Sequence, residues 1–69
     1  MTRGTVISYD TEEEQGYIDP DEGDERIPFD RKSLEDYPAG ETPAAGARVS
    51  FAVEGGMAGL WAIKVRRLD

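Results

Sequence analysis

The sequence predicts an all-β fold, a five-stranded antiparallel barrel formed by a single domain over residues 1–69. Five short segments rich in β-branched and aromatic residues show the alternation of apolar and polar positions that is typical of strands. Glycine, proline and aspartate separate these segments, and none of them shows the longer period of an amphipathic helix. A chain of 69 residues has room for one small hydrophobic core.

The inward positions of the five expected strands define that core. The strands are expected at residues 4–10, 15–19, about 25–30, 49–53 and 61–65. Their alternation directs six large apolar side chains inward, namely Ile18, Ile27, Phe29, Val49, Phe51 and Val65. Trp61 and Ile63 share the parity of Val65, which favours a place for Trp61 in the core or at the barrel end. A twisted strand can also turn a large ring outward near its start, so both placements stay open for Trp61.

The connections between the strands carry signals of their own. Residues 20–23, Pro-Asp-Glu-Gly, predict a tight turn, because proline has a fixed φ angle and glycine can adopt the φ angles that other residues avoid. Pro28 has no N–H group to donate, so its strand is expected to have a free edge at that point. Asp30 is expected to cap a brief helical turn over residues 31–34. The two prolines and two glycines of residues 35–46 predict a surface loop.

The net charge of −7 is concentrated in the first third of the chain. Residues 1–25 hold nine of the 15 acidic side chains but only one of the eight basic ones, so the remainder has seven bases against six acids. These acids either solvate two exposed loops or repel polyanions from a binding face beside them. The longest mostly apolar run, residues 57–63, is too short to cross a membrane, and the N-terminal residues lack the apolar segment of a secretion signal. We therefore expect a cytoplasmic protein.

The residues that usually support catalysis or metal binding are absent or badly spaced. The chain has neither cysteine nor histidine, and Glu12 and Glu14 lie on an expected hairpin loop with no partner that would tune them for acid–base chemistry. The aspartates at residues 19–24 resemble a calcium loop, but glycine falls at the fifth position and a strand occupies the twelfth. We expect no enzymatic activity, no metal site and no cofactor.

Three blocks of sequence carry a resemblance to a known family. They are residues 4–6 (Gly-Thr-Val), residues 16–23 (Gly-Tyr-Ile-Asp-Pro-Asp-Glu-Gly) and residues 49–54 (Val-Ser-Phe-Ala-Val-Glu), the last followed by a glycine-rich return. Over about residues 4–65 the chain resembles the cold-shock domain, a five-stranded OB-fold barrel that binds single-stranded DNA and RNA. The resemblance implies an OB-fold of the cold-shock-domain type and a function in binding single-stranded nucleic acid.

The nucleic-acid-binding residues of that family are largely replaced in this chain. The first ribonucleoprotein motif, usually Lys-Gly-Phe-Gly-Phe-Ile, reads Glu-Glu-Gln-Gly-Tyr-Ile at residues 13–18, so that Tyr17 alone keeps a stacking ring. The second motif, usually Val-Phe-Val-His-Phe, reads Ile-Pro-Phe-Asp-Arg at residues 27–31. The first strand, usually Val-Lys-Trp-Phe-Asn, reads Val-Ile-Ser-Tyr-Asp at residues 6–10. Because each stacked base contributes about 1–3 kcal/mol, these losses predict weak binding.

Seven residues are expected to contact a bound RNA or DNA strand: Tyr9, Gln15, Tyr17, Pro28, Arg31, Lys32 and Trp61. Arg31 can stack its guanidinium on a base and Pro28 can pack against one, whereas Lys32 and Arg31 also fit a solvated turn. The alternative function is a protein-interaction module that uses an exposed apolar patch of Ile7, Tyr9, Tyr17, Pro28 and Leu60. In either case we expect a monomer or a weak dimer.

Overall fold

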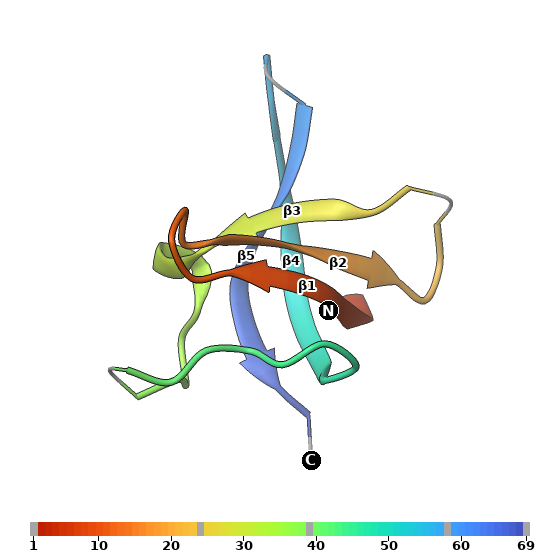
Figure 1. Cartoon of the computed structure of the whole chain (residues 1–69). Coiled ribbons are helices and arrows are strands. Elements are labelled where there is room, and N and C mark those ends of the chain that lie inside the picture. Colours follow the sequence, from red (N-terminus) through yellow and green to blue (C-terminus); the bar gives the residue numbers. More distant parts are fainter. Residues whose placement is uncertain (1, 24, 39, 58, 69) are drawn as a thin grey trace.

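One antiparallel sheet of five strands accounts for most of the computed structural model, which describes residues 2–23, 25–38, 40–57 and 59–68. The elements are β1 (Thr2–Asp10), β2 (Gln15–Pro20), β3 (Ile27–Asp30), the 3-10 helix η1 (Arg31–Ser33), β4 (Arg48–Gly56) and β5 (Gly59–Arg67). The strand order is β3-β2-β1-β4-β5. Because β3 and β5, at the two ends of this order, pack against each other, the sheet curls into a barrel (Figure 1). The predicted five-stranded antiparallel fold is confirmed.

The hydrophobic core contains all six residues that the alternation pointed inward. Ile18, Ile27, Phe29, Val49, Phe51 and Val65 are buried, and Val6 and Ala62 complete the cluster. Gly16 adjoins this core at a point where a side chain would not fit. A Cβ atom on Gly16 would collide with the Ser8 carbonyl oxygen and would lie 2.8 Å from the Phe29 ring. Glycine at this position therefore lets β1 and Phe29 pack closely.

The alternation of β5 is interrupted by a bulge, and of the two placements left open for Trp61 the outward one is observed rather than the one in the core that its parity favoured. Ser50 pairs with Arg66 and Ala52 with Ile63, so that β5 has two residues where β4 has one. Lys64 lies at this bulge with a φ of 53°. The extra residue turns each β5 side chain that precedes the bulge to the opposite face of the sheet. Ala62 consequently points inward with Val65, while Trp61 is 51% exposed.

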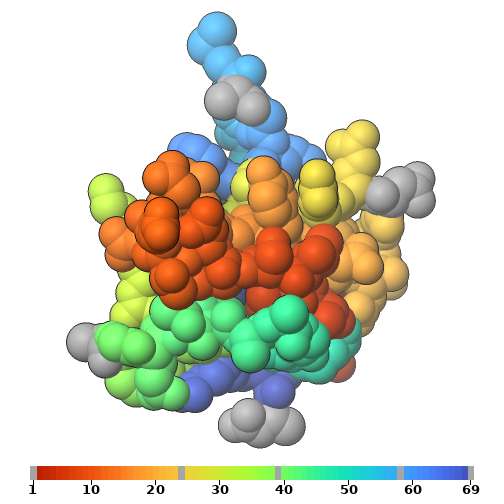
Figure 2. All heavy atoms as spheres, viewed as in Figure 1, coloured from red at the N-terminus to blue at the C-terminus, as the bar shows by residue number. Residues whose placement is uncertain are grey.

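The β4–β5 hairpin extends beyond the barrel as a two-stranded ribbon, seen at the top of Figures 1 and 2. Val53 lies on this ribbon and pairs with Ala62. Val53 shares the parity of the buried residues Val49 and Phe51, yet it is 41% exposed, whereas its partner Ala62 is buried. Alternation alone thus predicts the face on which Val53 lies, but it does not predict how much of this side chain is buried where the hairpin leaves the barrel.

The edge of the sheet and the following turn agree with expectation. The strand β3 is at one end of the sheet and pairs with β2, so Pro28 lies on an edge strand as predicted. The Asp30 carboxylate accepts hydrogen bonds from the backbone N–H and the hydroxyl of Ser33, at 3.1 and 3.0 Å, and caps η1. The strand begins at Ile27 rather than near residue 25, and the helical turn ends at Ser33.

Candidate nucleic-acid interface

The outer face of β2 and β3 displays the residues that the alternation placed there. Tyr17 pairs with Pro28 and Gln15 with Asp30 across the two strands, so these four side chains share one face of the sheet. Tyr17 is 40% exposed, and Gln15 and Pro28 are also exposed. The predicted outward placement of Gln15, Tyr17 and Pro28 is confirmed.

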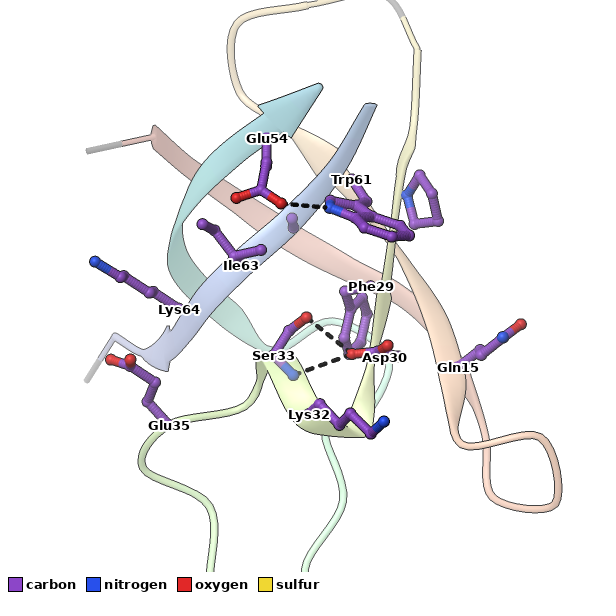
Figure 3. Close-up of a pocket in the computed structure, with 12 residues that line it drawn as sticks. Gln15, Phe29, Asp30, Lys32, Ser33, Glu35, Glu54, Trp61, Ile63 and Lys64 are labelled. Atoms are coloured by element: carbon purple, nitrogen blue, oxygen red, sulfur yellow. Dashed lines mark hydrogen bonds between the residues drawn. The ribbon is translucent and has the colours of Figure 1, made fainter. Parts of the chain in front are cut away.

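A groove of about 430 Å³ runs between this face and β5. Pro28, Phe29 and Lys32 line it on the side of β3 and η1, and Trp61, Ile63 and Lys64 line it on the side of β5. Figure 3 shows Trp61 and Glu54 at one end, Phe29 in the middle, and Asp30, Ser33 and Lys32 toward the other end. The groove therefore joins an exposed indole to the surface that carries Tyr17 and Pro28.

Trp61 is held by a polar contact on the β4–β5 hairpin. Its indole N–H donates to the Glu54 carboxylate at 3.3 Å (Figure 3). The two residues are also cross-strand partners. Since the only tryptophan of the chain is half exposed and oriented by this contact, it offers a large flat surface beside the groove.

Tyr17 is only partly available for stacking. The guanidinium carbon of Arg26 lies 4.7 Å from the centre of the Tyr17 ring, which is a favourable cation–π distance. Arg26 therefore covers one face of the ring, and a base that approaches Tyr17 must use the other face or displace the arginine.

Tyr9 lies deeper than its expected place in an exposed patch. Its ring is partly buried against the core and stacks on Phe29, with ring centroids 5.8 Å apart and planes inclined by 26°. Burial, and then the charge of Glu14, raise the pKa of the Tyr9 hydroxyl. The pairing of Tyr9 with Gly16 explains this position, because both residues face the side of the sheet on which Phe29 packs.

Arg31 is engaged in holding a loop rather than projecting toward the groove. Its guanidinium donates to the carbonyl oxygens of Glu41, at 2.7 Å, and Pro38, at 3.2 Å. The structure thus brings Lys32, but not the Arg31 guanidinium, to the wall of the groove. These two hydrogen bonds fix the orientation of the Arg31 guanidinium toward the loop.

Most of the other arginines form ion pairs within the domain. Arg48 makes a bidentate contact with Asp21, at 2.7 and 2.6 Å, and this hydrogen bonding lowers the pKa of the Asp21 carboxyl. Arg66 pairs with Glu35 at 2.7 Å, and Arg67 lies 4.0 Å from Asp36. Among the described residues, neither Lys32 nor Lys64 takes part in an ion pair.

The acidic hairpin between β1 and β2 has a partly structural explanation. The Asp10 carboxylate accepts hydrogen bonds from the backbone N–H groups of Glu12, at 2.9 Å, and Glu13, at 3.3 Å. Glu13 also borders shallow depressions beside Gln15. The described residues hold no cluster of three or more carboxylates that would suit a metal ion. They likewise contain no helix with the length and hydropathy of a membrane span.

Sequence reasoning missed several residues of the groove, among them Glu54 and Lys64. Glu54 precedes the glycine-rich turn of a hairpin, and apart from its charge nothing in the sequence indicated a place in a binding site. Lys64 stands between Ile63 and Val65, and a lone lysine among apolar residues does suggest a side chain directed to solvent. Its place on the wall of the groove follows from the bulge, which the sequence did not reveal.

The five-stranded antiparallel sheet, curled so that β3 packs against β5, defines a fold of the OB type. No family model and no curated protein matches the sequence. The solved structure described as Drosophila Unr CSD456, a cold-shock domain structure, matches with a TM-score of 0.81 at 22% sequence identity. The match covers 99% of this chain and 26% of that chain, so the present sequence spans about a quarter of it. The fold is that of a cold-shock-type OB barrel.

Proposed function

We propose that this domain binds single-stranded RNA or DNA, and binds it weakly. One observation carries the proposal: Tyr17 and Pro28 lie exposed beside a groove whose opposite wall presents the half-exposed indole of Trp61. Flat side chains on a continuous surface bind unpaired bases without requiring a particular sequence. The similarity of the fold to a cold-shock domain structure supports this use of the surface.

The surrounding residues argue for low affinity. Arg26 covers part of Tyr17, the ring of Tyr9 packs on Phe29, and Arg31 is bonded to loop carbonyls. Carboxylates of the β1–β2 hairpin, including Glu13, lie close to Gln15 and repel phosphates. With about 1–3 kcal/mol for each stacked base, two partly accessible rings give affinities far below those of a full aromatic platform.

A titration with short oligothymidine, followed by amide chemical shifts, tests the proposal. Shifts should be largest at Gln15, Tyr17 and Trp61, and saturation should require more than micromolar oligonucleotide at physiological salt. Binding should weaken as salt increases because phosphate contacts release counterions. The absence of any shift at millimolar concentration of oligonucleotide would reject the function, and sub-micromolar binding would reject its weakness.

The alternative is a protein-interaction module, and the projecting β4–β5 hairpin favours it. Ile7, Val53, Met57 and Leu60 are all exposed. Val53 lies in β4, Leu60 in β5 and Met57 in the turn that follows β4, so these three belong to the hairpin that extends from the barrel (Figure 2). Exposed apolar groups of this kind can bind a protein or a second copy of the domain. Sedimentation at increasing concentration separates the two functions, since apolar self-association is insensitive to salt whereas binding to oligonucleotides is not.

A further inference from the structure

The charged groups that line the groove differ in whether they already have partners. Asp30 caps η1, Glu35 pairs with Arg66, and Glu54 accepts the indole N–H of Trp61. Lys32 and Lys64 line the same groove without an ion pair to any described residue. The groove is thus predisposed to an anion beside its lysines even though carboxylates outnumber them.

The end of the groove at Trp61 combines a stacking surface with a fixed hydrogen-bond acceptor. Trp61 is half exposed, and its contact with the exposed Glu54 occupies one carboxylate oxygen at 3.3 Å. The second oxygen of Glu54 takes no part in any hydrogen bond with a described residue. An ionised carboxylate only accepts hydrogen bonds, so a base that lies on this indole is favoured when it carries a donor.

We infer that the groove between β3 and β5 binds one nucleotide of the strand, and that it selects a base with an exocyclic amine. This inference rests on the proposed function and names the base class that the site takes. The base stacks on Trp61 and its amine donates to Glu54, while the flanking phosphates lie toward Lys32 and Lys64. Cytosine, adenine and guanine carry such an amine, whereas thymine and uracil have carbonyl oxygens on the ring and only the N3–H as a donor.

The single tryptophan makes the inference directly measurable. Short oligodeoxycytidine should quench the fluorescence of Trp61 and bind roughly three- to tenfold more tightly than oligothymidine of equal length, because one additional hydrogen bond to the exposed Glu54 distinguishes them. Trp61→Ala should weaken oligodeoxycytidine binding by roughly five- to a hundredfold, measured by anisotropy of a labelled oligonucleotide. Trp61→Phe keeps a ring and should retain much of the affinity.

Glu54→Gln tests the selection of the base separately from the general effect of charge. A glutamine can both donate and accept, so this variant should bring the ratio of cytidine to thymidine affinity close to one. Glu22→Gln, at an exposed residue that does not line this groove, is the matched control. It removes the same charge and should raise the affinity for both oligonucleotides without changing their ratio.

The possible failures are distinguishable. Amide shifts at Gln15 and Tyr17 without quenching of Trp61, and with no loss of affinity in a folded Trp61→Ala variant, would overturn the groove and leave the proposed function standing. Quenching of Trp61 with oligothymidine bound as tightly as oligodeoxycytidine would overturn the selection of an amine-bearing base. If no oligonucleotide shifts any amide, the proposed function and this inference both fail.

Discussion

Restoring a ring on β2 should tighten nucleic-acid binding without disturbing the barrel. Gln15 is exposed, lies on the same face as Tyr17 and borders the groove, so Gln15→Phe adds a stacking surface where the related ribonucleoprotein motif has phenylalanine. One additional stacked base is worth about 1–3 kcal/mol, or roughly a 5- to 150-fold increase in affinity. Glu13→Lys, on the exposed hairpin next to it, changes the local charge by two units and should steepen the salt dependence.

Asp30 is excluded from this rescue for a structural reason. Its outward parity and its acidity make Asp30→His an obvious third change from the sequence alone. The structure shows that the Asp30 carboxylate caps η1 through two hydrogen bonds to Ser33. Loss of such a cap costs about 0.5–2 kcal/mol, so the triple variant should be less stable than the double variant.

Anisotropy of a labelled oligothymidine at two salt concentrations is the appropriate assay. Gln15→Leu together with Glu13→Lys is the matched control, because it adds apolar area and the same charge but no ring. The double variant should bind more tightly than this control. If both variants fold, as judged by their amide spectra, and bind no better than the parent at either salt concentration, the face of Gln15 and Tyr17 does not contact nucleic acid.

Three further predictions concern the barrel itself. Phe51→Ala should lower the free energy of unfolding by about 3–5 kcal/mol in urea denaturation because Phe51 is fully buried, and a loss below 1 kcal/mol would contradict the core. Hydrogen bonding to Arg48 lowers the pKa of the Asp21 carboxyl, so the contact stabilises the domain at pH values above the ordinary pKa of 3.8. This stabilisation is lost as the pH falls through the lower pKa of the folded state. Asp21→Asn should therefore make the free energy of unfolding depend less on pH in this acidic range. Lys64→Gly should relieve the positive φ and stabilise the domain by about 1 kcal/mol, while it weakens oligonucleotide binding; a destabilised variant would contradict the strain.

The barrel and its core could be predicted because both depend on a local signal. Each strand is short and one of its faces is buried, so the period of two in the sequence reports directly on burial. Ile27 and Phe29 alternate with exposed Pro28 in four residues, and Gly16 and Ile18 alternate with Gln15 and Tyr17. The same signal correctly placed Tyr17 and Gln15 at the candidate site.

The two bulges could not be predicted because no residue type announces them. In β1 the extra residue is Ile7, between Val6 and Ser8, and in β5 the bulge lies at Lys64. Isoleucine and lysine are ordinary strand residues, and a lysine with a φ of 53° is rare enough that glycine would be expected there. A one-residue insertion reverses the face of every side chain beyond it, which is why the alternation favoured the core for Trp61 and could not decide between the two placements.

Long-range partners account for the remaining differences at the site. Tyr9 packs on Phe29 from another strand, and the Arg31 guanidinium reaches carbonyl oxygens at residues 38 and 41. The local sequence marks both residues only as aromatic or basic. Whether such a side chain binds a ligand or its own chain depends on contacts that the sequence does not encode locally.

The bulge in β5 also changes which side of the groove offers an aromatic ring to a bound base. Stacking rings are missing from β2 and β3, on one wall of the groove, where Gln15 and Asp30 now stand. On the opposite wall, the reversed parity of β5 turns Trp61 out of the core and toward the same groove. With Gln15 and Asp30 on one wall and Trp61 on the other, the groove still offers a base one flat surface. A strand bound as we propose would therefore lie close to β5, and its affinity, although low, should depend most on Trp61.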